Sequence, residues 1–153
     1  MKTEYQTQFT AGEVTLGYIK KEQQLAYKIQ SSQDCNKFLR TIFPLEKINH
    51  REYAYLLLLN RNSHVVGYYQ LSAGGISGTM IDPKLVFQCA LLANASAIIL
   101  CHNHPSTNLT PSKADESITQ KIKQAGKFMD ISLLDHIIIT DTSYYSFADE
   151  GML

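Results

Sequence analysis

Two histidines and an aspartate near the middle of the chain have the types and spacing of a metal site. Residues 101–115 read Cys-His-Asn-His-Pro-Ser-Thr-Asn-Leu-Thr-Pro-Ser-Lys-Ala-Asp and follow a run of apolar residues. Residues two apart on a strand point to the same face, so His102 and His104 can converge from one strand end. Asp115 can meet them if the chain turns back. Two imidazoles and one carboxylate are a familiar ligand set for catalytic zinc, with a fourth position open for water.

Two further residues could complete a hydrolytic site. Ser112 lies three residues before Asp115 and could hydrogen-bond the metal-bound water or a developing oxyanion. Bound zinc can lower the pKa of its water to about 7, and a carboxylate that is not a ligand must then pass the proton to the leaving amine. Glu52, at the start of the apolar strand predicted at 51–60, is the best candidate for this general base. It lies near the histidines if that strand pairs with the one predicted at 97–101.

Each of these features also has a purely structural interpretation. His-x-His pairs are more often structural or exposed than metal-binding, and Ser112-x-x-Asp115 is the pattern of an ordinary helix capping box. Glu52 by itself could be a surface acid at a strand end. His136, inside an apolar strand, is either a core histidine or a partner of a ligand, and Asp135 beside it could orient a ligand imidazole. The conjunction of the four motif positions is what favours a metal site.

Strands alternate with helices along the chain, which predicts an α/β layered fold. The hairpin of the strands at 51–60 and 64–70 makes the expected sheet mixed. Asp82-Pro83 indicates a helix start, and Thr110-Pro111 repeats that signal for the helix that carries Asp115. The predicted elements are strands at 14–19 and 25–29, a helix at 31–42, strands at 51–60 and 64–70, a helix at 83–94, a strand at 97–101, a helix at 110–129, and strands at 133–140 and 144–147. The helix residues expected to face the core are Leu85, Val86, Cys89, Ala90 and Ala93 in one helix and Ile118, Ile122, Ala125 and Met129 in the next.

The composition fits one globular domain with a full-sized core in 153 residues. Fourteen basic and fourteen acidic residues cancel, so no global field draws the chain towards nucleic acid. The apolar runs are too short to span a membrane and no secretory segment opens the chain, which favours a cytoplasmic location. The scattered cysteines Cys35, Cys89 and Cys101 are expected to be reduced, with Cys101 on the opposite face from His102.

These residues together resemble the signature of a known metalloprotease family. His102-x-His104, seven residues, Ser112, two residues and Asp115 is similar at all four defining positions to the JAMM (MPN+) motif. The segment His-Asn-His-Pro-Ser looks like the RadC branch, bacterial proteins labelled as DNA repair proteins. The likeness extends from about residue 29 to the end of the chain.

The resemblance implies a cytidine-deaminase-like fold of three layers, α/β/α, around a mixed sheet. It implies zinc held by His102, His104 and Asp115, with Ser112 contacting the catalytic water or the oxyanion and Glu52 as the general base. Many JAMM enzymes cleave isopeptide bonds to ubiquitin-like modifiers. The implied activity is therefore hydrolysis of an amide bond in a peptide or protein substrate.

The resemblance also leaves an alternative open. RadC proteins usually carry a helix-hairpin-helix region before the metal domain, whereas residues 1–28 here are expected to form only a strand or hairpin ahead of a metal domain at 29–153. The chain could be a DNA-repair-associated or protein-interaction module with little peptidase activity, although its balanced charge does not support DNA binding. A deaminase is disfavoured, because those sites use a Pro-Cys-x-x-Cys segment that this sequence lacks. The oligomeric state stays open.

Overall fold

The computed structural model describes residues 27–75 and 80–153. The strand predicted at 14–19, and nearly all of the N-terminal extension at 1–28, lie outside these residues. At the described end of the extension, Lys28 forms an isolated antiparallel bridge with His64.

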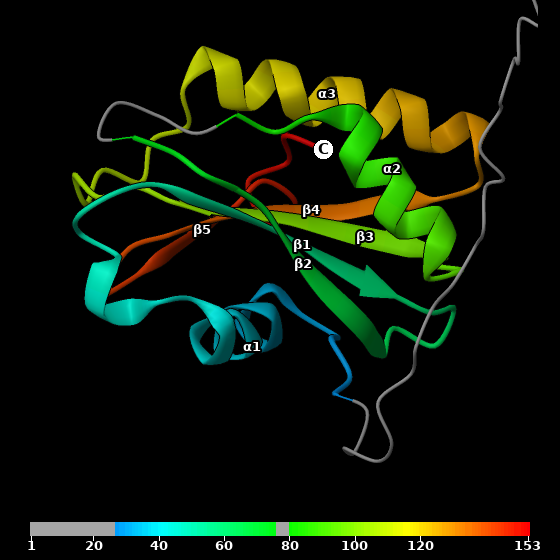
Figure 1. Ribbon diagram of the computed structural model, residues 1–153, viewed down its shortest axis with the longest axis horizontal. Helices are drawn as coiled ribbons and strands as arrows, with labels where there is room; N and C mark the ends of the chain where they lie inside the picture. Colours follow the sequence, from blue (N-terminus) through cyan, green and yellow to red (C-terminus); the bar gives the residue numbers. More distant parts are fainter. Residues whose placement is uncertain (1–26, 76–79) are drawn as a thin grey trace, which may run out of the picture.

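The described elements alternate between helices and strands (Figure 1). In chain order they are α1 (Ser32–Ile42), the 3-10 turn η1 (Leu45–Lys47), β1 (Tyr53–Leu59), β2 (Val65–Ala73), α2 (Pro83–Leu92), β3 (Ala97–Asn103), α3 (Lys113–Phe128), β4 (Ser132–Ile139) and β5 (Tyr144–Ser146). The strands form one sheet in the order β2-β1-β3-β4-β5. The pair β3-β4 is parallel and the other pairs are antiparallel, which confirms the predicted mixed sheet.

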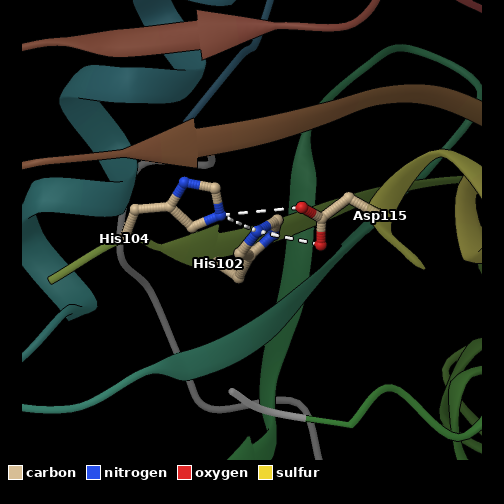
Figure 2. Close-up of side chains that lie close together, drawn as sticks. All are labelled: His102, His104 and Asp115. Carbon is tan, nitrogen blue, oxygen red and sulfur yellow. Dashed lines mark hydrogen bonds and ion pairs between the residues drawn. The ribbon is translucent and has the colours of Figure 1, made fainter. Parts of the chain in front are cut away.

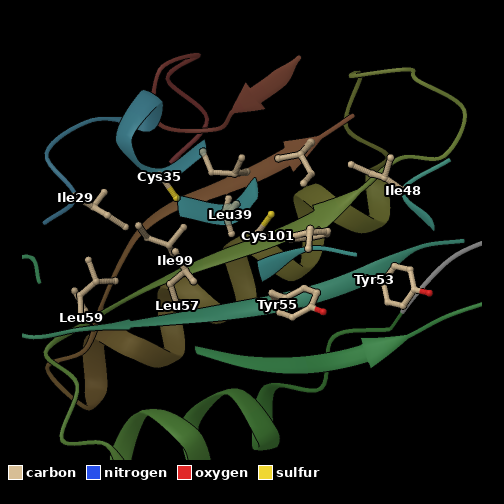
Figure 3. Packing of buried hydrophobic residues seen from close by; sticks show 14 residues of the cluster. Ile29, Cys35, Leu39, Ile48, Tyr53, Tyr55, Leu57, Leu59, Ile99 and Cys101 are labelled. Carbon is tan, nitrogen blue, oxygen red and sulfur yellow. The ribbon is translucent and has the colours of Figure 1, made fainter. Parts of the chain in front are cut away.

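Helices cover both faces of the sheet, which confirms the three layers (Figure 1). On one face, Cys35 and Leu39 of α1 join Leu57, Ile99 and Cys101 of the central strands in an apolar cluster (Figure 3). The alternate residues of the same strands form a second cluster with α2 and α3 on the other face. The central strands β1 and β3 are buried along their whole length, as continuous apolar runs covered on both faces should be.

Polar side chains start the helices, in two cases as predicted. Ser31 caps α1 and Asp82 caps α2. The start of α3 differs: Thr110-Pro111 stays outside the helix, and Ser112 is the N-cap. Ser112 and Asp115 accept each other's backbone N–H groups in a reciprocal capping box, which satisfies two unpaired donors where Thr110 would satisfy one.

The inward faces of the helices also differ from the prediction at single residues. Phe87 of α2 is buried although the predicted face omitted it. Met129 was predicted to face the core, but it is 36% exposed because it is the C-cap, where the helical periodicity ends. In α3 the buried residues are Thr119, Ile122 and Gly126.

Two further observations concern the cysteines and the length of the helices. Cys35, Cys89 and Cys101 are free thiols, and Cys35 and Cys101 are buried. Within residues 27–75 and 80–153, no helix has both the length and the apolar character that crossing a bilayer requires.

Candidate metal centre

The three predicted ligands meet where the end of β3 faces the start of α3 (Figure 2). His102 lies within β3 and His104 directly follows it. The N–H of His104 donates to the carbonyl of Ile139 at 3.1 Å, which prolongs the pairing of β3 with β4 past the last strand residue. Asp115 lies in the first turn of α3. The strand end and the returning helix therefore bring together the residues that the sequence singled out.

The ligand-type atoms of these side chains point toward one another (Figure 2). Nε2 of His102 lies 2.9 Å from Nε2 of His104 and 3.3 Å from Oδ1 of Asp115. Nε2 of His104 lies 3.6 Å from Oδ2 of Asp115, and the three ligand positions all lie within 4.8 Å of one another. Two imidazole nitrogens and a carboxylate oxygen gathered in this way are a donor set that fits zinc.

The capping box of α3 aims Asp115 at the histidines. Oδ2 of Asp115 accepts both the N–H and the hydroxyl of Ser112, each at 2.7 Å. Burial acts to raise the pKa of Asp115, but the contacts with His102, His104 and Ser112 outweigh it and hold the pKa well below its usual range. The two interpretations of Ser112-x-x-Asp115, capping box and site motif, are therefore compatible. A contact of Ser112 with water or an oxyanion stays a prediction.

The second nitrogen of His104 is held by the loop between β3 and α3. Nδ1 of His104 lies 2.6 Å from the carbonyl oxygen of Asn108. Because a carbonyl only accepts, Nδ1 carries the hydrogen and Nε2 is left to face His102 and Asp115. The hydrogen bond with Asp115 raises the pKa of His104, although burial opposes this.

Glu52 lies just before β1, at the same end of the sheet as the histidines. The antiparallel register of β1 with β3 pairs Ala54 with His102, which brings Glu52 level with His104. The carbonyl of Glu52 accepts the N–H of Gly74 at 2.8 Å, and its carboxylate is among the charges that raise the pKa of His104. The strand pairing on which the prediction of Glu52 depended is confirmed, while its role as general base stays a prediction.

His136 and Asp135, neighbours on β4, point to opposite faces as strand alternation requires. His136 is fully buried and its Nε2 lies 2.8 Å from Nδ1 of His102, so it is both a core histidine and a partner of a candidate ligand. Burial lowers its pKa. Asp135 instead accepts from the hydroxyl of Ser146 at 2.6 Å and from backbone N–H groups. Of the two residues that could orient a candidate ligand imidazole, the structure therefore places His136, and not Asp135, beside His102.

Asn103, between the two histidines, has a role that the sequence reading missed. Its buried amide accepts from the N–H of Tyr53 at 2.7 Å and donates to the carbonyls of Ile48 at 2.7 Å and Arg51 at 2.9 Å. These bonds fasten the segment that carries Glu52 to the strand that carries the histidines. The sequence offered one signal of this role. Strand alternation turns the residue between His102 and His104 away from the site, and that residue carries an amide side chain.

Comparisons with known proteins agree with this architecture. The family model described as RadC-like JAB domain matches residues 29–152. The UPF0758 protein of Flavobacterium johnsoniae is 49% identical over 125 residues, which are 82% of this chain and 53% of the relative. The UPF0758 protein of Thermotoga maritima is 40% identical over 126 residues, 82% of this chain and 55% of the relative.

A shorter relative matches as well. The UPF0758 protein YfjY of Escherichia coli is 45% identical over 103 residues, 67% of this chain and 64% of the relative. The chain spans about half the length of most of the curated relatives it matches, 53% and 55% in the first two cases. None of these names states an activity.

Proposed function

The chain belongs to the RadC-like JAB domain family, and on that premise we propose that it is a zinc-dependent hydrolase of the metallopeptidase type. Its substrate is a peptide or protein, cut at an amide or isopeptide bond. The observation that carries the proposal is the convergence of His102, His104 and Asp115, whose ligand atoms all lie within 4.8 Å of one another.

In this proposal His102, His104 and Asp115 hold the zinc, which when bound activates water and polarises the substrate carbonyl. Glu52 does not bind the metal. Its carboxylate takes a proton from the attacking water and gives it to the nitrogen of the leaving amine.

Ser112 keeps Asp115 in place through its N–H and hydroxyl. A hydrogen bond from that hydroxyl to the catalytic water or the oxyanion, the second role proposed for Ser112, competes with the bond to Asp115. Movement of the hydroxyl between these acceptors would let one residue serve both the metal ligand and the substrate.

The first test is the metal content of the purified chain after zinc is supplied under non-chelating conditions. We expect about one zinc per wild-type chain, by the three-ligand geometry, and loss of that zinc in His104→Ala. Elemental analysis of both proteins after gel filtration gives the answer. A wild-type chain that remains free of zinc contradicts the proposal.

The second test separates the base from the metal ligands. Glu52→Gln should keep its zinc and lose about 10²- to 10⁴-fold in the hydrolysis of a fluorogenic peptide and isopeptide panel, because it removes only the proton carrier. The matched control is Glu46→Gln, the same change at an exposed glutamate of η1, which should keep both zinc and activity. Unchanged hydrolysis in Glu52→Gln would remove Glu52 from the mechanism.

A further inference from the structure

A chain of hydrogen bonds leads from the metal site back to the main chain of the same helix that supplies Asp115. Nδ1 of His102 lies 2.8 Å from Nε2 of His136, whose Nδ1 lies 2.6 Å from the hydroxyl of Thr119. That hydroxyl donates to the carbonyl oxygen of Asp115 at 2.6 Å. His102, His136 and Thr119 are all buried, so these polar atoms depend on one another for partners.

The carbonyl at one end decides the direction of every bond in the chain. A carbonyl oxygen only accepts, so the single hydroxyl hydrogen of Thr119 is directed at Asp115. Thr119 must then accept from Nδ1–H of His136. A neutral imidazole with hydrogen on Nδ1 has an acceptor at Nε2, so His136 accepts from Nδ1–H of His102. In the neutral ring of His102, the form that can bind a metal, the lone pair is then on Nε2, the atom that faces His104 and Asp115.

We propose that Thr119 and His136 are positioning residues that hold His102 in the Nδ1–H tautomer and so keep its Nε2 available as a metal ligand. The inference rests on the proposed function, because the metal in that proposal is the group that the lone pair would bind. His104 reaches the same tautomer through one backbone carbonyl, that of Asn108. His102 lies inside the sheet, where neighbouring carbonyls are engaged in strand pairing, and it needs side chains to do the same.

This arrangement couples two ligands through one residue of α3. The carboxylate of Asp115 faces the metal side of His102, while its main-chain carbonyl orients the opposite side through Thr119 and His136. The partner of His102 is an imidazole, so it orients the ligand without adding negative charge behind it, unlike the carboxylate partners common at zinc sites. The docking of α3 on the sheet therefore sets both the position of one ligand and the tautomer of another.

Zinc affinity tests the inference. Thr119→Val removes the hydroxyl with little change in volume and frees His136 to take either tautomer, so affinity should fall by about 10- to 100-fold. Thr119→Ser keeps the hydroxyl and should stay within about threefold of wild type, by the same reasoning. Competition of each metal-free protein with a fluorescent zinc chelator measures this, and circular dichroism checks that each variant is folded. Wild-type affinity in folded Thr119→Val overturns the proposal.

The tautomers can also be read without metal and without a substitution. Nitrogen-15 chemical shifts and long-range couplings of the imidazoles distinguish Nδ1–H from Nε2–H in the 153-residue chain after chelation. We expect Nδ1–H at both His102 and His136, whereas the exposed His50 should show the mixture of an unconstrained imidazole. An Nε2–H tautomer at His102 overturns the proposal whatever the fate of the variants.

The proposed function and this inference fail on different results. A wild-type chain that binds zinc but cleaves no peptide or isopeptide contradicts the hydrolase. Equal zinc affinity in wild type and Thr119→Val contradicts the positioning role of Thr119 and leaves the hydrolase standing.

Discussion

Replacing Asn103 with alanine should lower the free energy of unfolding by about 2–6 kcal/mol. The substitution removes three hydrogen bonds at once. Tyr53 and Ile48 are buried residues, so the N–H of the first and the carbonyl of the second lose partners that water cannot replace, at about 1–3 kcal/mol each. Arg51 is exposed, and its carbonyl can turn to water. The loss is a large part of the stability of a domain that has about 5–15 kcal/mol in all.

Urea unfolding of the wild type, Asn103→Ala and a control measures this difference. The control is Asn49→Ala, the same truncation at an exposed residue whose amide donates to Asp141 at 3.1 Å. That variant should lie within about 0.5 kcal/mol of wild type, as most surface changes do. A loss below about 1 kcal/mol in Asn103→Ala, with a well-behaved control, would show that these bonds do not hold the two segments together.

The other predictions concern the metal, the pH and the packing of α3. Zinc at a thousand times its dissociation constant should stabilise the wild type by about 4 kcal/mol. The melting temperature should then rise by about 8–16 °C. Chelation should reverse this rise, and His104→Ala should not show it. Burial, although opposed by hydrogen bonds from Ser146 and from backbone N–H groups, raises the pKa of Asp135 above its ordinary value of 3.8. The folded state thus holds this proton more tightly than the unfolded state, and the stability it contributes is lost as the pH rises through the raised pKa. Asp135→Asn cannot ionise. In urea unfolding, its free energy of unfolding relative to that of the wild type should therefore be higher at pH 7 than at pH 4. Gly126→Ala should destabilise the folded state by about 1–3 kcal/mol, because the new Cβ overlaps the carbonyl oxygen of Ile131. In most helices the same change is stabilising. A stabilised variant in thermal unfolding would contradict that packing.

Local patterns predicted the candidate ligands because each pattern depends on the periodicity of a single element. The spacing of His102 and His104 places them on one face of a strand whatever that strand pairs with. The start of α3 was misplaced because Thr110-Pro111 and Ser112 are overlapping start signals that obey the same local rules. The competition between them is decided by the reciprocal bonds of Ser112 with Asp115, which only the folded helix displays.

Glu52 illustrates a prediction that local patterns can state only conditionally. Its nearness to the histidines required that β1 pair with β3, a choice made by contacts between segments some fifty residues apart, such as Ala54 with His102. Met129 shows a different kind of error. The helical period was correct, but the prediction extended it past Phe128, where the helix ends.

By itself the sequence determined the candidate ligand types, the common face of His102 and His104, and the alternation of strands and helices, because side-chain spacing along one element settles which face each residue occupies. The tertiary structure alone decided what those side chains contact behind the site. Asn103, Thr119 and His136 acquire their roles from atoms that distant segments bring within hydrogen-bonding distance. Such bonds depend on strand register and on the docking of α3, and their direction follows from which partner can only accept. No repeating pattern along the chain encodes either property.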